Sequence, residues 1–145
     1  MRTFSQAVVW QVFLGHRISR ILIIDDDLAL LAGLAEMPSL RLWRVEIATC
    51  HQSAFAVSMA QQGQYDVILC DCWMPHMNGL DLLPLLRRTA PQASILMMSG
   101  AVTEAVRDAA FSHGAKLFLS KPFDREEVTM TIKQVLKEHH ASEDR

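Results

Sequence analysis

Ile21-Leu22-Ile23-Ile24-Asp25-Asp26-Asp27 is the stretch of sequence that decides the fold. Its four aliphatic residues predict a strand that is buried on both faces, as in a parallel sheet. Three carboxylates follow directly, and two carboxylates about 4 Å apart repel by roughly 4 kcal/mol at an effective dielectric of about 20. A hard divalent cation with oxygen ligands would neutralise this charge. The stretch therefore predicts a buried strand that ends in a cation site.

The composition is that of a single domain with a real core. Half of the 145 residues are hydrophobic, which argues against disorder. The net charge of −2 supplies no general basic field, so we expect no direct binding of nucleic acid. No apolar run reaches the ~18 residues that a membrane span needs. We therefore expect no membrane span.

The three cysteines, Cys50, Cys70 and Cys72, form no disulfide framework. An odd number of cysteines without such a framework fits the reducing cytosol, so we expect a cytoplasmic protein. Zinc sites usually separate their cysteines by two to four residues and need a second ligand pair, which Cys70-x-Cys72 does not offer. We expect all three to be small buried apolar residues.

Predicted strands and helices alternate after residue 20, and Pro38, Gly63, Pro91 and Gly114 mark the helix ends. This alternation predicts an α/β fold, a doubly wound parallel sheet with helices on both faces. The predicted strands are Ile21–Ile24, Leu42–Ala48, Asp66–Cys70, Ser94–Met98 and Lys116–Leu119. The predicted helices are Leu28–Met37, Gln52–Gln62, Gly79–Arg88, Glu104–His113 and Arg125–Glu138.

Polar residues stand at the carboxyl ends of four predicted strands. Asp71 follows the third strand, Ser99 follows the fourth, and Lys121-Pro122 follows the fifth, while the acidic triplet follows the first. Ligands of open parallel sheets bind outside these strand ends. If the strands lie side by side, the carboxylates, one hydroxyl and one ammonium converge on one site.

Four motifs, in order, resemble a response-regulator receiver domain, the phospho-acceptor module of two-component signalling. The resemblance covers residues 21–138 and implies a flavodoxin-like (βα)5 fold with strand order 2-1-3-4-5. The motifs are the first-strand motif 21–27, the phosphorylation loop Tyr65–Leu80, the pair Ser99-Gly100, and the stretch from Gly114-Ala115 to Lys121-Pro122-Phe123.

The resemblance implies a role for each strand-end residue. Asp71 would accept a phosphoryl group from a histidine of a kinase and form an acyl phosphate. Mg²⁺ would be held by Asp25, Asp26, Asp71 and the backbone carbonyl of Trp73, with Asp26 as the more direct ligand and Asp25 acting through water. Lys121 would contact a phosphoryl oxygen as a point charge.

The same resemblance implies a switch. Ser99, beside the small Gly100, would donate a hydrogen bond to the phosphoryl group, and Phe118 would rotate into the vacated space. The alternatives are an ordinary turn serine and a buried core phenylalanine. The surface that changes would comprise the fourth helix, the fifth strand and the fifth helix.

Further expectations concern four residues: Trp73, Ala101, Pro122 and Asp27. Trp73 flanks the site and Ala101 offers no polar group to orient water, so we expect slow spontaneous loss of the phosphoryl group. The resemblance implies a cis bond before Pro122, and we expect Asp27 to cap the first helix.

Residues 1–19 lie outside the receiver pattern and form an N-terminal extension of unknown role, residues 20–140 form the receiver domain, and residues 141–145 form a polar tail. No output domain is recognised, so a stand-alone receiver is expected. The apolar helix Leu28–Met37 either packs simply against the sheet or contacts a partner.

The implied function is a phosphorylation switch, and not a turnover enzyme. Its partners would be a sensor histidine kinase or a histidine phosphotransfer protein and an unknown downstream protein, with a homodimer as a further possibility. The alternative is a phosphorylation-independent pseudo-receiver. A haloacid-dehalogenase-type phosphatase is disfavoured by Ala29, which stands where that motif has threonine or valine, and no Gly-x-Gly-x-x-Gly supports a dinucleotide site.

Overall fold

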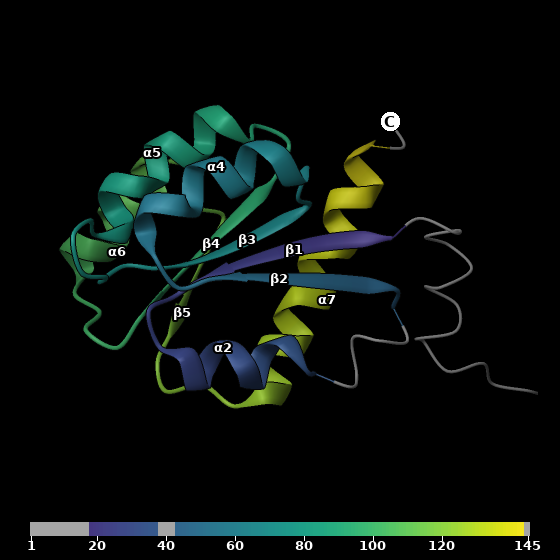
Figure 1. Ribbon diagram of the computed structural model, residues 1–145, viewed down its shortest axis with the longest axis horizontal. Helices are drawn as coiled ribbons and strands as arrows, with labels where there is room; N and C mark the ends of the chain where they lie inside the picture. Colours follow the sequence, from purple (N-terminus) through teal and green to yellow (C-terminus); the bar gives the residue numbers. More distant parts are fainter. Residues whose placement is uncertain (1–17, 38–42, 144–145) are drawn as a thin grey trace, which may run out of the picture.

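Residues 18–37 and 43–143 are described by a computed structural model, shown in Figure 1. Strands and helices alternate along them. The strands are β1 (Ser19–Ile24), β2 (Val45–Cys50), β3 (Val67–Asp71), β4 (Ser94–Ser99) and β5 (Leu117–Ser120). The helices are α2 (Leu28–Ala35), α4 (Ser53–Gly63), α5 (Gly79–Thr89), α6 (Glu104–Ser112) and α7 (Arg125–Glu143).

The five strands form one parallel sheet in the order β2-β1-β3-β4-β5, which confirms the predicted fold class and strand order. Helices α4, α5 and α6 cover one face, and α2 and α7 cover the other (Figure 1). The central strands β1 and β3 are buried on both faces because both are covered by helices, so their sequences are almost continuously apolar.

Alternate residues of β1 contribute to two separate cores. Leu22 and Ile24 pack with α4, α5 and α6, while Ile21 and Ile23 pack with α2 and α7. All four side chains are 0 % exposed. The strand that precedes the acidic triplet is thus fixed from both sides, which sets the position of the carboxylates at its end.

The second strand begins later and ends later than predicted. Trp43 lies in a turn and Arg44 adopts a φ of 53°, so the chain enters β2 only at Val45. The strand continues to Cys50 because Cys50 still pairs with Ile24 of β1. The predicted first residue of this strand, at position 42, lies outside the described residues.

The last helix is longer than predicted and runs to Glu143 instead of Glu138. His139 and His140 are buried, and they bond to residues at the amino ends of the strands. The Nε2 atom of His139 lies 3.2 Å from a carboxylate oxygen of Asp66, and that of His140 lies 3.0 Å from the Ser19 hydroxyl. These contacts hold the end of α7 against the sheet, so residues 141–143 of the predicted polar tail are helical. Residues 1–17 and 144–145 lie outside the description.

The loop between β3 and α5 is held closely against the end of β3. The backbone N–H of Gly79 donates to the Cys72 carbonyl at 2.7 Å, and the Asn78 side chain caps α5 by accepting from the N–H of Asp81. A Cβ atom at position 79 would overlap the Asp71 carbonyl oxygen and lie 2.9 Å from the Cys72 Cα. Only glycine fits there, and the close approach positions Asp71. Among the described residues, no helix has the length and apolar character needed to cross a bilayer.

Candidate functional site

Three carboxylates meet at the carboxyl ends of β1 and β3. The two strands are neighbours, with Ile24 opposite Cys70, so the residues that follow them lie at the same edge of the sheet. One carboxylate oxygen from each of Asp25, Asp26 and Asp71 lies within 4.8 Å of the others. Asp25 and Asp71 are buried and Asp26 is exposed. The predicted convergence of Asp25, Asp26 and Asp71 is therefore present.

This donor set fits Mg²⁺. All three groups are hard oxygen donors, and the exposed Asp26 leaves one side of the cluster open to water, which Mg²⁺ usually retains as ligands. Asp25 has both oxygens in use, because one accepts from the N–H of Asp27 at 2.9 Å and the other from Lys121. The involvement of the Trp73 carbonyl stays a prediction.

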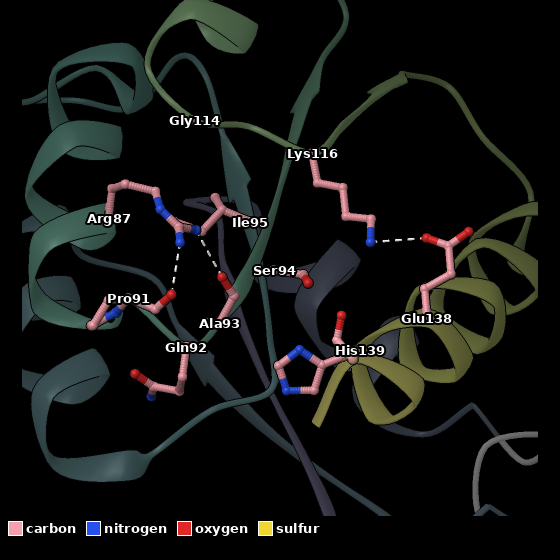
Figure 2. A pocket seen from close by; sticks show the side chains of 11 residues that line it. Arg87, Pro91, Gln92, Ala93, Ser94, Ile95, Gly114, Lys116, Glu138 and His139 are labelled. Atoms are coloured by element: carbon pink, nitrogen blue, oxygen red, sulfur yellow. Dashed lines mark hydrogen bonds and ion pairs between the residues drawn. The ribbon is translucent and has the colours of Figure 1, made fainter. Parts of the chain in front are cut away.

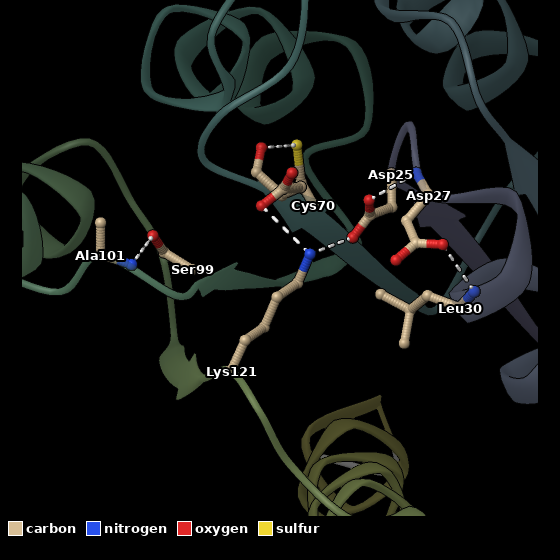
Figure 3. A network of polar contacts seen from close by, with 8 residues as sticks. Asp25, Asp27, Leu30, Cys70, Ser99, Ala101 and Lys121 are labelled. Carbon is tan, nitrogen blue, oxygen red and sulfur yellow. Dashed lines mark hydrogen bonds and ion pairs between the residues drawn. The ribbon is translucent and has the colours of Figure 1, made fainter.

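Lys121 lies between two of the carboxylates (Figure 3). Its ammonium donates to Asp25 at 2.5 Å and lies 3.5 Å from a carboxylate oxygen of Asp71. The bond between Lys121 and Pro122 is cis, as the resemblance implies. The sequence predicts that Lys121 contacts a phosphoryl oxygen, but no local sequence signal indicates its pairing with Asp25.

The electrostatics of the cluster show that its negative charge is only partly compensated. Burial, and then repulsion by Asp25, raises the pKa of the Asp71 carboxyl from 3.8 to about 6, although Lys121 and the backbone N–H of Trp73 oppose the shift. Burial alone would lower the pKa of Lys121, but its contacts with Asp25 and then Asp71 outweigh this effect and raise it. A divalent cation would relieve the remaining repulsion.

Ser99 is the last residue of β4, and Ala101 follows this strand on the other side of the site. The buried Ser99 hydroxyl accepts a hydrogen bond from the Ala101 N–H at 3.1 Å (Figure 3). A Cβ atom at Gly100 would make an ordinary contact of 3.8 Å with Lys121, so the position does not require glycine. Asp27 caps α2, as predicted, by accepting from the N–H of Leu30 at 3.1 Å.

Phe118, on β5, is partly buried and packs against the core beneath α4, α5 and α6. The guanidinium of Arg107, on α6, lies 6.0 Å from the centre of its ring. This cation–π contact stabilises the present position of the ring. The sequence offered no signal that would pair Arg107 with Phe118.

Trp73 stands at the rim of the site with 47 % of its surface exposed. Its backbone N–H bonds to the Asp71 carboxylate and helps to fix the carboxylate in place. The three cysteines are free and buried, as predicted, and burial raises the pKa of Cys72 to about 11. The Cys72 thiol beside the acceptor is therefore un-ionised and unreactive at neutral pH.

A cavity of about 460 Å³ lies at the opposite end of the sheet, between α5 and the end of α7 (Figure 2). Its charged groups are already paired. Arg87 donates to the carbonyl groups of Ala93 and Pro91, and Lys116 forms an ion pair of 2.9 Å with Glu138. The cavity contains none of the predicted site residues.

Comparison with known proteins gives one consistent family. The sequence model described as "Response regulator receiver domain" matches residues 21–133. The chain is 30% identical over 125 residues to the response regulator MprA of Mycobacterium avium, covering 86% of this chain and 54% of that protein. It is 32% identical over 125 residues to the transcriptional regulatory protein CpxR of Escherichia coli, covering 86% of this chain and 52% of that protein. The chain thus spans about half the length of these relatives.

Solved structures agree on the fold. A CheY-like receiver domain protein from Methanospirillum hungatei superposes with a TM-score of 0.81 at 23% identity, covering 87% of this chain and 99% of that one. The chemotaxis protein CheY4 of Vibrio cholerae superposes with a TM-score of 0.74 at 25% identity, covering 82% and 99%.

Asp71→Asn should raise the melting temperature of the metal-free protein at pH 7.5, on the order of 5 °C. Because the pKa of Asp71 is raised to about 6, the folded chain binds this proton more tightly than the unfolded chain. The resulting stabilisation is complete below about pH 4 and is lost as the pH rises through about 6. Asparagine is uncharged at both pH values. The variant should therefore melt at a higher temperature than wild type only at the higher pH, where the Asp71 carboxylate is ionised.

Thermal unfolding in EDTA at pH 4.0 and pH 7.5 checks this expectation. Asp108→Asn, on the exposed side of α6, is the matched control and should change the melting temperature little at either pH. An equal gain for Asp71→Asn at both pH values would contradict the account.

Proposed function

The chain belongs to the response-regulator receiver domain family, and on that premise we propose that it is a phospho-acceptor switch of a two-component system. Asp71 is the proposed acceptor, and a histidine kinase or histidine phosphotransfer protein is the proposed donor. The observation that carries the proposal is the meeting of three carboxylates and the Lys121 ammonium at one edge of the sheet.

The transfer step follows from the position of Asp71. A carboxylate oxygen of Asp71 forms the new bond to phosphorus while the bond between phosphorus and the donor imidazole nitrogen breaks, and the electron pair stays on the imidazole. The Trp73 N–H holds the carboxylate in place during the attack. Mg²⁺ bound by Asp25, Asp26 and Asp71 would neutralise charge on the transferring group.

Lys121 supplies the second positive charge. In the unphosphorylated protein its ammonium bonds to Asp25 and lies 3.5 Å from Asp71. A phosphoryl group on Asp71 places new oxygens next to this ammonium, so a small movement of the side chain changes its partner from Asp25 to the phosphoryl group. Lys121 thereby favours the phosphorylated form.

We assign the conformational response to Ser99 and Phe118. The Ser99 hydroxyl accepts one hydrogen bond from Ala101 and can donate its own hydrogen to a phosphoryl oxygen. Movement of Ser99 would change the packing around Phe118, which Arg107 now covers. The surface of α6, β5 and α7 would then present a changed face to a downstream protein. The chain acts in this proposal as a stoichiometric acceptor in the cytoplasm, and not as a turnover enzyme.

Incubation with acetyl phosphate and Mg²⁺ should add one phosphoryl group to the wild-type protein, as measured by intact-protein mass spectrometry. Asp71→Asn should gain no mass because the acceptor oxygen is lost, and wild type in EDTA should gain little. Asp81→Asn, which changes an exposed carboxyl on α5, is the control and should be labelled like wild type. Equal labelling of Asp71→Asn would disprove the assignment, and an unlabelled wild type would support the pseudo-receiver alternative.

Trp73→Asn should accelerate the spontaneous loss of the phosphoryl group several-fold. The indole ring at the rim obstructs water and Ala101 supplies no polar group, whereas an asparagine amide could hold an attacking water. Decay of the labelled protein after removal of acetyl phosphate measures the rate. Met77→Asn changes another exposed apolar residue of the same loop and should leave the rate unchanged; an unaltered rate for Trp73→Asn would refute the shielding role.

A further inference from the structure

A long part of this chain, from residue 47 to residue 80, exposes no formally charged side chain. Charged residues make up 21% of the whole chain, but this part contains only Asp66 and Asp71, and both are buried. Its two histidines, His51 and His76, are exposed and count as neutral. The surface that runs from β2 over α4 to the β3–α5 loop is therefore uncharged.

This surface carries an apolar projection on α4. Phe55 lies near the start of the helix with 57 % of its surface exposed. The other exposed positions of α4 carry small or uncharged polar side chains: Ala54, Ser58, Gln61 and Gln62. An exposed aromatic ring with few charges around it is typical of the centre of a protein interface.

A groove of about 410 Å³ opens on the same surface. Ala54, the neighbour of Phe55 in the sequence, lines one side of it, and Met74, Pro75 and His76 of the β3–α5 loop line the other. Phe55 is not among the lining residues, so its exposed ring lies outside the groove. The surface thus carries an aromatic projection and a groove next to it.

The groove also leads to the proposed acceptor. Asp26 contributes to its lining, and one carboxylate oxygen of Asp26 lies within 4.8 Å of an oxygen of Asp71. A group that fills the groove therefore lies at the entrance to Asp71.

We propose that two copies of the unphosphorylated chain pair through α4 and the β3–α5 loop, here called the uncharged face, with Phe55 of each copy in the groove of the other. In a two-fold dimer the same surface meets itself, so a surface with both a projection and a groove is self-complementary. Side chains near the two-fold axis meet their own copies, and like charges there would repel each other. The absence of charge removes this repulsion, and burial of Phe55 against Met74 and Pro75 favours pairing.

Other exposed apolar side chains of the described residues fit a two-fold dimer less well. Leu28 on α2 is 64 % exposed. The groove of about 210 Å³ beside α2 contains the guanidinium of Arg125, which pairing would bury without an opposite charge. Phe111 on α6 shares its helix with the exposed charges of Arg107 and Asp108.

Pairing and phosphorylation oppose each other, and this step of the inference rests on the proposed function. Phe55 of one copy covers the entrance to Asp71 of the other, so a paired copy accepts a phosphoryl group slowly. A phosphoryl group on Asp71 adds about −1.5 to −2 charges beside the groove. The apolar surface of the other copy offers this charge no compensation, so phosphorylation separates the dimer.

Sedimentation velocity at protein concentrations from about 1 µM to about 500 µM, in EDTA and without a phosphoryl donor, measures pairing. Wild type should change from monomer to dimer over this range. Phe55→Asp should raise the Kd of the dimer about a hundredfold or more, because the dimer loses an anchor at both of its contacts. Leu28→Asp and Phe111→Asp place the same charge on α2 and α6 and should dimerise like wild type. All three replaced side chains are exposed, and circular dichroism verifies that the variants fold.

Labelling by acetyl phosphate and Mg²⁺ measures the covering of Asp71. The initial rate per chain should fall several-fold as the wild-type concentration rises through the Kd of the dimer. Phe55→Asp should keep the rate of dilute wild type at every concentration, because it stays monomeric. Wild type that has been fully labelled should sediment as a monomer.

Two kinds of result would overturn the inference. A wild type that stays monomeric over the whole range, or a Phe55→Asp variant that dimerises normally, would remove the uncharged face as a dimer interface. A labelling rate that is independent of concentration although the dimer forms, or a labelled protein that stays dimeric, would remove the covering of Asp71. Failure to label even dilute wild type would instead remove the proposed function, while the dimer measured without a donor would stand.

Discussion

Repulsion among carboxylates at the ends of two adjacent strands is the constraint on which the site depends. Asp25 and Asp71 are both buried, and together with Asp26 they bring oxygens within 4.8 Å of one another. The Lys121 ammonium compensates part of this charge, while burial, and then repulsion by Asp25, raise the pKa of Asp71 to about 6. A site with this surplus favours whatever brings positive charge: a proton, the lysine or a divalent cation.

The packing of the fold holds the three carboxylates close together. β1 and β3 are packed from both sides, so the chain cannot relax by moving the carboxylates apart without disturbing two cores. The loop after Asp71 is held by Gly79, where any side chain would collide with backbone. A receiver domain must keep these carboxylates close together in the absence of the phosphoryl group. A cation that binds among them relieves their mutual repulsion.

The parts of the fold that local sequence determines were predictable. The aliphatic runs before Asp25 and Asp71 identified the central strands, and the polar residues after them located the site at one sheet edge. The strand order came from the family resemblance, and the structure confirms it. Contacts between distant residues were not predictable, because no local pattern encodes them. The pairing of Lys121 with Asp25, the position of Arg107 over Phe118 and the burial of His139 at the end of α7 are of this kind.

Titration calorimetry of Mg²⁺ binding in buffers of different ionisation enthalpy tests the central claim most directly. With a pKa of about 6 for Asp71, the cation should displace roughly half a proton per protein at pH 6 and almost none at pH 8. The apparent binding enthalpy should therefore depend on the buffer at pH 6 and not at pH 8. Binding heats that are independent of the buffer at both pH values, or no binding at all, would contradict the account.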